Sequence, residues 1–232
     1  MGSPRPLRVS EIFESIQGEG HSAGEPCTFL RLATCNLRCA WCDTKYTWDW
    51  TAFRYEDEVH TMSVTDVRER IVRSSSGRLV ITGGEPLLQR RELEALLAEL
   101  PPDLFVEVET NGTLSSGDLL AARIDQWNVS PKLANSGESV ERRLSLDVLL
   151  SFRDTGRAFL KLVLDGDADA SEATSLIRQL DWPYDRVLLM PQAASRAELL
   201  EKGPCIEALA SRLQVRASPR LHVLRWDGKR GT

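Results

Sequence analysis

The stretch Cys35-Asn36-Leu37-Arg38-Cys39-Ala40-Trp41-Cys42 places three thiols within eight residues of a chain that has five cysteines in all. A C-x3-C-x2-C loop lets three sulfurs converge on one point without long-range folding, and thiolates favour zinc or an iron–sulfur cluster over calcium or magnesium. Four local cysteines would complete the ligand set of either centre, whereas three leave one coordination position for a small molecule. The loop therefore predicts a metal centre with an open position, which is typical of catalysis.

A structural zinc site is the alternative interpretation of the same three thiols. Its fourth ligand would lie elsewhere in the chain, and the candidates are Cys27, Cys205, His21, His60 and His222. Cysteine and histidine are the side chains that usually complete such sites. The spacing of the loop does not separate the two interpretations, so the rest of the chain has to decide between them.

Composition favours a single cytoplasmic domain that acts on a small molecule. The chain has 232 residues, of which 42% are hydrophobic and 27% charged, as in ordinary soluble globular proteins. We expect one domain over residues 1–232, with residues 1–6 disordered. The net charge of −5 argues against a nucleic-acid partner, because neutralising phosphates requires a basic face. No apolar run is long enough to cross a membrane, and clustered unpaired cysteines fit a reducing compartment.

Strand-like and helix-like segments alternate along most of the chain. The strands that we expect cover residues 7–16, 27–33, 79–82, 104–110, 126–130, 159–164 and 186–190. The helices that we expect cover 65–73, 87–100, 117–123, 145–154, 171–180 and 195–213. Such alternation of strands and helices, in six units, predicts an α/β fold with a mostly parallel sheet covered by helices. It does not by itself separate an open sheet from a partial barrel.

Polar and glycine-rich loops follow several of these strands. In parallel α/β folds, ligands bind at the carboxyl ends of strands, so these loops are where a site is expected. They are Gly83-Gly84-Glu85-Pro86, Thr110-Asn111-Gly112-Thr113, Ser130-Pro131-Lys132 and Pro191-Gln192. In the first loop, two glycines let the backbone approach a ligand and Glu85 offers a carboxylate to an ammonium group. A plain strand-to-helix turn is the alternative for that loop.

Glu107 and Glu109 alternate with valines in one expected strand. Both carboxylates therefore face the same side of the sheet, toward the mouth of a barrel if the sheet curves that far. One of them has a structural alternative, a buried ion pair with Lys161 from another strand.

The cysteine loop and the glycine loop together resemble the radical S-adenosylmethionine superfamily. The shared features are C-x3-C-x2-C with Trp41 directly before its third cysteine, and Gly83-Gly84-Glu85-Pro86 after the next expected strand. Nearly from end to end, further stretches resemble 7-carboxy-7-deazaguanine synthases: Ile16-Gln17-Gly18-Glu19-Gly20, Phe29-Leu30-Arg31, Cys42-Asp43-Thr44, Glu109-Thr110-Asn111-Gly112-Thr113, Ser130-Pro131-Lys132 and Lys229-Arg230-Gly231-Thr232. This resemblance favours the cluster over zinc.

The resemblance implies a partial, open TIM-like barrel of about six parallel βα units. By resemblance, Cys35, Cys39 and Cys42 hold a [4Fe–4S] cluster, whose remaining iron binds the amino and carboxylate groups of S-adenosylmethionine. That accounts for the missing fourth cysteine. The further cofactor-binding residues that the resemblance implies are Trp41, Gly83, Gly84, Glu85, Glu109, Ser130, Pro131, Lys132 and Gln192.

The family's substrate is 6-carboxy-5,6,7,8-tetrahydropterin. By resemblance, Thr44 coordinates Mg²⁺ together with the substrate carboxylate, and the substrate-binding residues are Ile16, Gln17, Gly18, Glu19, Arg31, Thr82 and Thr232. The guanidinium of Arg31 suits that carboxylate, because its planar fork matches two oxygens. The alternatives are a surface arginine for Arg31, a cap or turn residue for Asp43 and a frayed chain end for Thr232.

The activity that the resemblance implies is the conversion of this pterin into 7-carboxy-7-deazaguanine by radical ring contraction with loss of ammonia, in queuosine and 7-deazapurine biosynthesis. We name no catalytic acid or base, because the cofactor carries the radical chemistry. An electron donor such as flavodoxin or ferredoxin and a homodimer are further expectations from the family. One rival is a glycyl-radical activase, which has no need of residues 17–20 or 229–232, and the other is a non-catalytic zinc-binding module.

Overall fold

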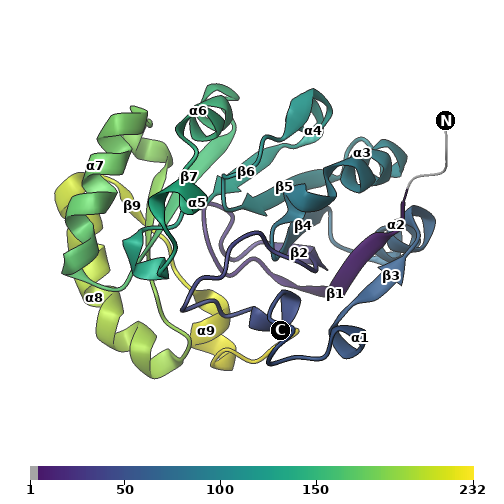
Figure 1. Ribbon diagram of the computed structural model, residues 1–232, viewed down its shortest axis with the longest axis horizontal. Coiled ribbons are helices and arrows are strands. Elements are labelled where there is room, and N and C mark those ends of the chain that lie inside the picture. Colours follow the sequence, from purple (N-terminus) through teal and green to yellow (C-terminus); the bar gives the residue numbers. More distant parts are fainter. Residues whose placement is uncertain (1–4) are drawn as a thin grey trace.

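The structure is a computed structural model that describes residues 5–232 of the chain. These residues contain one curved sheet of nine strands (Figure 1). Its strand order is β3-β1-β2-β4-β5-β6-β7-β8-β9. Strand β1 pairs antiparallel with β2 and β3, and every neighbouring pair from β2 to β9 is parallel. The strands are β1 (Leu7–Ile16), β2 (Pro26–Leu32), β3 (His60–Met62), β4 (Arg78–Gly83), β5 (Phe105–Thr110), β6 (Gln126–Val129), β7 (Ala158–Leu164), β8 (Val187–Pro191) and β9 (Arg216–Ala217).

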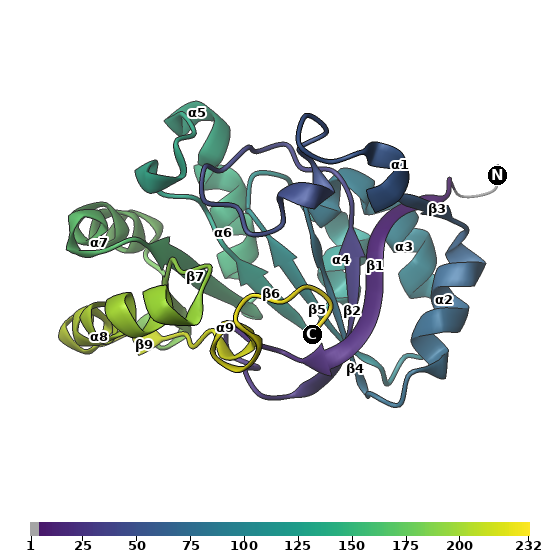
Figure 2. The same cartoon turned by 90° about the horizontal axis from the view of Figure 1, so that it is seen from below.

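The longer helices cover the convex side of the sheet, whereas the short helix α9 and the end of the chain lie on its concave side (Figure 2). The helices are α1 (Tyr55–Glu58), α2 (Val64–Arg73), α3 (Arg90–Glu99), α4 (Gly117–Arg123), α5 (Val140–Arg143), α6 (Leu146–Asp154), α7 (Ala170–Leu180), α8 (Arg196–Leu213) and α9 (Leu221–Trp226). The concave side is thus free to form a cavity.

The expected α/β fold with an open barrel is confirmed. Strands β2, β4, β5, β6, β7 and β8 are the six expected parallel strands, and a segment with at least one helix joins each to the next. The expected helix over 87–100 is divided, because the side chain of Glu85 accepts from Leu87 N and Pro86 begins a 3₁₀ turn that precedes α3. Strands β3 and β9 and helices α1, α5 and α9 were not expected, since each is too short to show a periodic pattern.

The central strands owe their position to buried apolar side chains. Leu79 and Ile81 of β4 and Val106 and Val108 of β5 are fully buried. They pack under the helices of the convex side, as in other sheets whose strands are covered by crossover helices. Helix α2 begins with a side-chain N-cap, because the Ser63 hydroxyl accepts a hydrogen bond from Asp66 N at 3.1 Å.

The two glutamates of β5 point to the concave side, as expected. Gln17 Nε2 donates to both carboxylates, at 2.8 Å to Glu107 and 3.2 Å to Glu109. The structural alternative for one of them, an ion pair with Lys161, is wrong. Glu107 pairs with Arg78 at 3.1 Å, and Lys161 binds Glu19 instead, because the loop after β1 brings a third carboxylate nearer to β7.

The ends of the chain carry little regular structure. Of the expected disordered start, residues 1–4 lie outside the described residues, and Arg5 and Pro6 are exposed and precede β1. Within residues 5–232, none of the helices combines the length and apolarity that crossing a membrane requires.

The loop after β4 packs backbone against backbone with the segment that leads into the cysteine loop. Gly84 N donates to the Leu32 carbonyl at 3.0 Å, and Glu85 N donates to the Thr34 carbonyl at 2.8 Å. A Cβ on Gly84 would lie 1.9 Å from the Thr34 oxygen, and one on Gly83 would lie 2.1 Å from the Leu32 oxygen. Both glycines are therefore required by close packing within the chain itself.

We expect Gly84→Ala to lower the free energy of unfolding by about 1–3 kcal/mol, the usual cost of overpacking, since the two backbones must separate. The matched control is Gly77→Ala, because a Cβ on Gly77 would meet nothing within 4 Å. The control should change stability by less than about 1 kcal/mol. Denaturant unfolding of both variants measures the difference, and equal midpoints would contradict the packing argument.

Candidate active site

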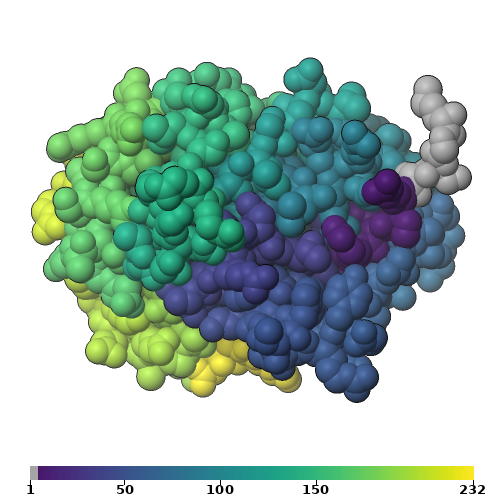
Figure 3. All heavy atoms as spheres, in the orientation of Figure 1, coloured from purple at the N-terminus to yellow at the C-terminus, as the bar shows by residue number. Residues whose placement is uncertain are grey.

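A cavity of about 370 Å³ opens on the concave side of the barrel, and all but two of the residues predicted from the sequence line it. Those residues are Ile16, Gln17, Gly18, Glu19, Arg31, Cys35, Cys39, Trp41, Cys42, Thr44, Thr82, Gly83, Gly84, Glu109, Ser130, Lys132, Gln192 and Thr232. The segment after β2, dark blue in the space-filling view, covers the middle of one face of the molecule (Figure 3). The cavity thus brings the cysteine loop and the loops after several strands to one place.

The three thiols fit an iron–sulfur cluster. Leu37 N donates to Cys35 Sγ at 3.4 Å, and Trp48 Nε1 donates to Cys42 Sγ at 3.3 Å. Such N–H donors stabilise cluster thiolates and tune the cluster's potential. Burial raises the pKa of Cys35 to about 12. Deprotonation of this thiol therefore needs a nearby cation, which a metal centre supplies.

The two predicted residues outside the cavity wall are Glu85 and Pro131. Glu85 is fully buried, and its carboxylate accepts hydrogen bonds from Asn111 N at 2.7 Å, Thr110 Oγ1 at 2.9 Å and Leu87 N at 3.0 Å. Burial raises the pKa of this carboxyl, and the hydrogen bonds partly offset that effect. The structure therefore directs Glu85 toward the loop after β5 rather than toward an ammonium group in the cavity.

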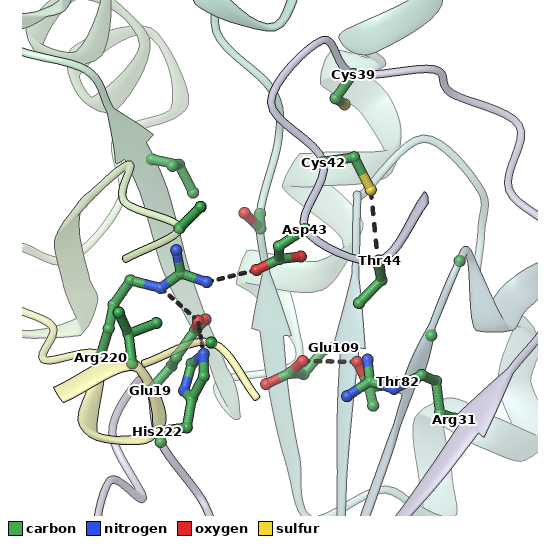
Figure 4. A pocket seen from close by; sticks show the side chains of 18 of the residues that line it. Glu19, Arg31, Cys39, Cys42, Asp43, Thr44, Thr82, Glu109, Arg220 and His222 are labelled. Carbon is green, nitrogen blue, oxygen red and sulfur yellow. Dashed lines mark hydrogen bonds and ion pairs between the residues drawn. The ribbon is translucent and has the colours of Figure 1, made fainter. Parts of the chain in front are cut away.

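One side of the cavity combines a guanidinium with polar groups from β4 and β5 (Figure 4). Thr82 Oγ1 donates to Glu109 Oε2 at 2.7 Å, and Gln17 Nε2 donates to the other oxygen of Glu109. Arg31 lies beside them, and its Nε donates to Glu11 Oε2 at 2.9 Å. The predicted cofactor-binding residue Glu109 thus shares hydrogen bonds with two predicted substrate-binding residues.

The opposite side of the cavity holds a partly buried ionic cluster around Glu19 (Figure 4). Glu19 pairs with Lys161 at 2.5 Å and with Arg220 at 3.0 Å, and His222 Nε2 lies 3.7 Å away. Burial by itself would raise the pKa of Glu19, but the two cations outweigh burial and hold the pKa below its usual range. Arg220 also binds Asp43 at 2.5 Å, so it joins Glu19 to the residue that follows the last cysteine of the loop.

The ligand atoms of Glu19, Asp43 and His222 lie within 4.8 Å of one another, a spacing that a metal ion could also use. Lys161 and Arg220 already balance the charges of the Glu19 and Asp43 carboxylates. A metal cation at this position would be repelled by both basic side chains. The arrangement is therefore better suited to a neutral polar ligand than to a metal.

The predicted cofactor-binding residues of the later loops form the wall next to the cysteines. Lys132 Nζ donates to Ser130 Oγ at 3.1 Å and lies 5.5 Å from the centre of the Trp41 ring. Gln192 accepts from Lys202 Nζ at 2.9 Å. Thr44 Oγ1 is 3.6 Å from Cys42 Sγ, so this hydroxyl sits between the thiol loop and the rest of the cavity.

Some residues of the cavity were missed by the sequence analysis. Asp43 was assigned a cap or turn, although its place between Cys42 and Thr44 was a local signal. Arg220 and Lys161 had no such signal for their present role, because each reaches Glu19 from a distant segment. His222 was named only as a remote zinc ligand, and Trp48 was not singled out.

Comparison with known proteins first defines the class. The family model of the radical SAM superfamily matches residues 31–194, which span the cysteine loop and the strands from β4 to β8. The half barrel and its three-thiol loop are therefore those of a radical SAM protein. Streptococcus suis SuiB shares this fold, with a TM-score of 0.53 at 15% identity over 79% of this chain and 47% of that one.

Relatives over the full length are more specific. A 7-carboxy-7-deazaguanine synthase from Pyrobaculum aerophilum is 39% identical over 99% of this chain and 98% of its own length. One from Hyperthermus butylicus is 38% identical over 94% of this chain and 92% of its own. A crystal structure of QueE from Escherichia coli superposes with a TM-score of 0.65 at 28% identity, covering 93% and 94% of the two chains. This chain belongs to the 7-carboxy-7-deazaguanine synthase family.

Family membership implies a [4Fe–4S] cluster and S-adenosylmethionine as cofactors, and the donor set described above fits them. Three thiols of one loop, two of them accepting N–H groups, line the cavity beside Gly83 and Gly84. All five cysteines of the chain are unpaired, so none of the three is committed to a disulfide.

We expect Cys35→Ala to abolish retention of the cluster and to leave the fold largely intact, since Cys35 lies in a loop on the cavity wall. The measurement is iron and sulfide content after anaerobic reconstitution, together with circular dichroism. Cys205→Ala is the matched control, because Cys205 is a free cysteine of α8 outside the cavity. Equal iron content in the two variants would remove the cluster assignment.

Proposed function

We propose that the chain converts 6-carboxy-5,6,7,8-tetrahydropterin into 7-carboxy-7-deazaguanine with loss of ammonia, as a step of 7-deazapurine biosynthesis. The observation that carries this proposal is the shared cavity: it brings Arg31 and the loop 16–19 to the same space as the three thiols. A glycyl-radical activase or a zinc-binding module has no need of Arg31 and the loop 16–19 beside its thiols. The family membership of the chain points to the same reaction.

Arg31 binds the substrate carboxylate in this proposal. Glu11 occupies its Nε, and no hydrogen bond within residues 5–232 occupies its two terminal nitrogens. Two parallel N–H groups of a guanidinium match the two oxygens of a carboxylate. Its side chain is only 16% exposed, so the interaction with a carboxylate is weakly screened.

The polar groups around Glu19 and Glu109 hold the pterin ring. A pterin presents several N–H donors on one edge, and carboxylates accept such donors strongly. Both carboxylates are already oriented by other side chains: Glu19 by Lys161 and Arg220, and Glu109 by Thr82 and Gln17. Ile16, Gly18 and Thr232 complete this part of the wall. A ring bound here lies between Arg31 and the ionic cluster.

Thr44 is the proposed protein ligand of Mg²⁺. The ion usually keeps several waters and is completed by substrate oxygens, so a single hydroxyl from the protein suffices. Thr44 lies on the cavity wall, as Arg31 does, so a Mg²⁺ ion held by Thr44 would lie in the same cavity as the substrate carboxylate and would supply positive charge to it.

When bound, the cluster and S-adenosylmethionine supply a carbon-centred radical that takes a hydrogen atom from the substrate. The chain's own residues bind and orient the two ligands and keep water away from the reacting carbon. Trp41, Ser130, Lys132 and Gln192 are the proposed wall for the cofactor. Gly83 and Gly84 border the same space, whereas Glu85 and Pro131 lie outside its wall, and Glu85 holds the loop after β5 by accepting from Asn111 N.

Three further properties belong to this proposal. The cluster receives its electron from a small redox protein such as flavodoxin or ferredoxin. The chain acts as a single domain and as a homodimer. Its place is the cytoplasm, where free thiols stay reduced.

The direct test is anaerobic incubation of the reconstituted protein with the carboxypterin, S-adenosylmethionine, a reductant and Mg²⁺. We expect 7-carboxy-7-deazaguanine and ammonia, and slower turnover without Mg²⁺. Formation of 5′-deoxyadenosine without any change in the pterin would favour another radical enzyme. A colourless protein that contains zinc and no iron or sulfide would favour the zinc-binding module.

We expect Arg31→Ala to raise the KM for the pterin by about tenfold to a hundredfold, because charge-assisted hydrogen bonds contribute about 1.5–3 kcal/mol. The dissociation constant of S-adenosylmethionine should change by less than about twofold, since the contact proposed for Arg31 is with the substrate carboxylate and not with the cofactor. Arg54→Ala is the control, because that side chain is 77% exposed and outside the cavity. Equal losses for both ligands in Arg31→Ala would contradict the assigned role.

A further inference from the structure

The carboxylate of Glu11 is shared between the cavity and the C-terminal segment. Glu11 lies on β1 directly opposite Arg31 on β2 in the antiparallel pair. Its Oε2 accepts from Arg31 Nε at 2.9 Å and from Tyr46 OH at 3.0 Å. Its other oxygen, Oε1, accepts from Arg230 Nε at 2.6 Å. One carboxylate therefore divides its two oxygens between the proposed substrate-binding arginine and an arginine near the end of the chain.

Arg230 is held in this position by two further contacts. Its guanidinium carbon lies 3.8 Å from the centre of the Tyr46 ring, and its Nη2 pairs with Glu58 at 2.7 Å. The end of the chain lies beside β1 and β2 in both ribbon views (Figures 1 and 2). Residues 228–232 also line the cavity. The C-terminal segment thus reaches the back of Arg31 through Glu11.

The division of the two Glu11 oxygens matters because Glu11 can compete with the substrate carboxylate for the guanidinium of Arg31. The Glu11 and Arg31 side chains are 15% and 16% exposed, so water screens their attraction only in part. A carboxylate with no other cation near it tends to form a two-pronged contact with a guanidinium. Such a contact would take one of the terminal nitrogens that a substrate carboxylate needs. Arg230 holds Oε1 on the opposite side and leaves a single contact, at Nε.

We propose that Arg230 is a positioning residue: by binding the second oxygen of Glu11, it keeps the terminal nitrogens of Arg31 free for the substrate carboxylate. The inference rests on the proposed function for the identity of that substrate. It gives Arg230, to which the proposed function assigns no task, a positioning role toward the substrate carboxylate. The coupling runs from the C-terminal segment through Glu11 to Arg31.

The first test is Arg230→Gln, with the KM for the carboxypterin as the measurement. We expect an increase of about tenfold, equivalent to about 1.4 kcal/mol. Arg230→Lys keeps the positive charge and should stay within about threefold of the original protein. Glu58→Gln is the matched control, because Glu58 binds the same arginine but not Arg31. An equal increase in Arg230→Gln and Glu58→Gln would overturn the proposal.

Two readouts separate this role from mere ordering of the chain end. A tetrahydropterin without the carboxylate, used as a competing ligand, should bind Arg230→Gln as well as the original protein. In a Glu11→Gln background, adding Arg230→Gln should change the KM by less than about twofold, because no carboxylate is left to compete. Loss of affinity for both pterins, or a full tenfold effect in the Glu11→Gln background, would overturn the proposal.

The ion pair itself is tested without turnover by hydrogen–deuterium exchange of the amides of residues 228–232. Arg230→Gln and Glu11→Gln should both accelerate this exchange, because each removes the contact between β1 and the C-terminal segment. Unchanged exchange in both variants would overturn the inferred contact. If the original protein bound no carboxypterin but showed the exchange difference, the proposed function would fail and the contact would stand.

Discussion

The largely buried carboxylate of Glu19, whose side chain is 12% exposed, is the constraint on which the cavity depends. A carboxylate away from water is tolerated only when cations and donors satisfy it, and removing one partner of a buried pair costs about 3–5 kcal/mol. Glu19 meets this requirement with Lys161 from β7 and Arg220 from the segment before α9. Arg220 then reaches Asp43 of the cysteine loop. These ion pairs connect four parts of the chain at one point: the loop after β1, strand β7 of the barrel, the segment before α9 and the thiol loop.

The buried carboxylate of Glu85 likewise connects loops next to the cysteines. Glu85 accepts from the loop after β5 and from its own turn, and its N–H donates to Thr34, which precedes the first cysteine. Thr34 has a φ of +75°, a conformation that β-branched residues rarely adopt. Its N–H is held by the Thr47 carbonyl at 2.6 Å. The entry to the thiol loop is therefore set by hydrogen bonds from two other loops.

Much of the fold followed from local patterns, because the period of apolar residues and the cap residues act within a few positions. Strand β1 and helix α4 begin and end where expected, and most of the other expected helices and strands differ by one or two residues. The candidate residues at the strand ends also converged, since carboxyl ends of parallel strands meet at one edge. The partner of Lys161 was not predictable: its choice of Glu19 over the glutamates of β5 depends on where a loop folds back over the barrel.

The sequence by itself determined the chemistry: three thiols at C-x3-C-x2-C spacing with an open position, and polar loops after parallel strands, both of which are properties of short segments. Only the tertiary structure decided how those groups are oriented. It turned Glu85 away from the cavity, joined Glu19 to Arg220 across 201 positions, and set Arg230 behind Arg31 through Glu11. The physical reason is that ion pairs between distant segments depend on the closing curvature of the sheet, which leaves no periodic trace in the sequence.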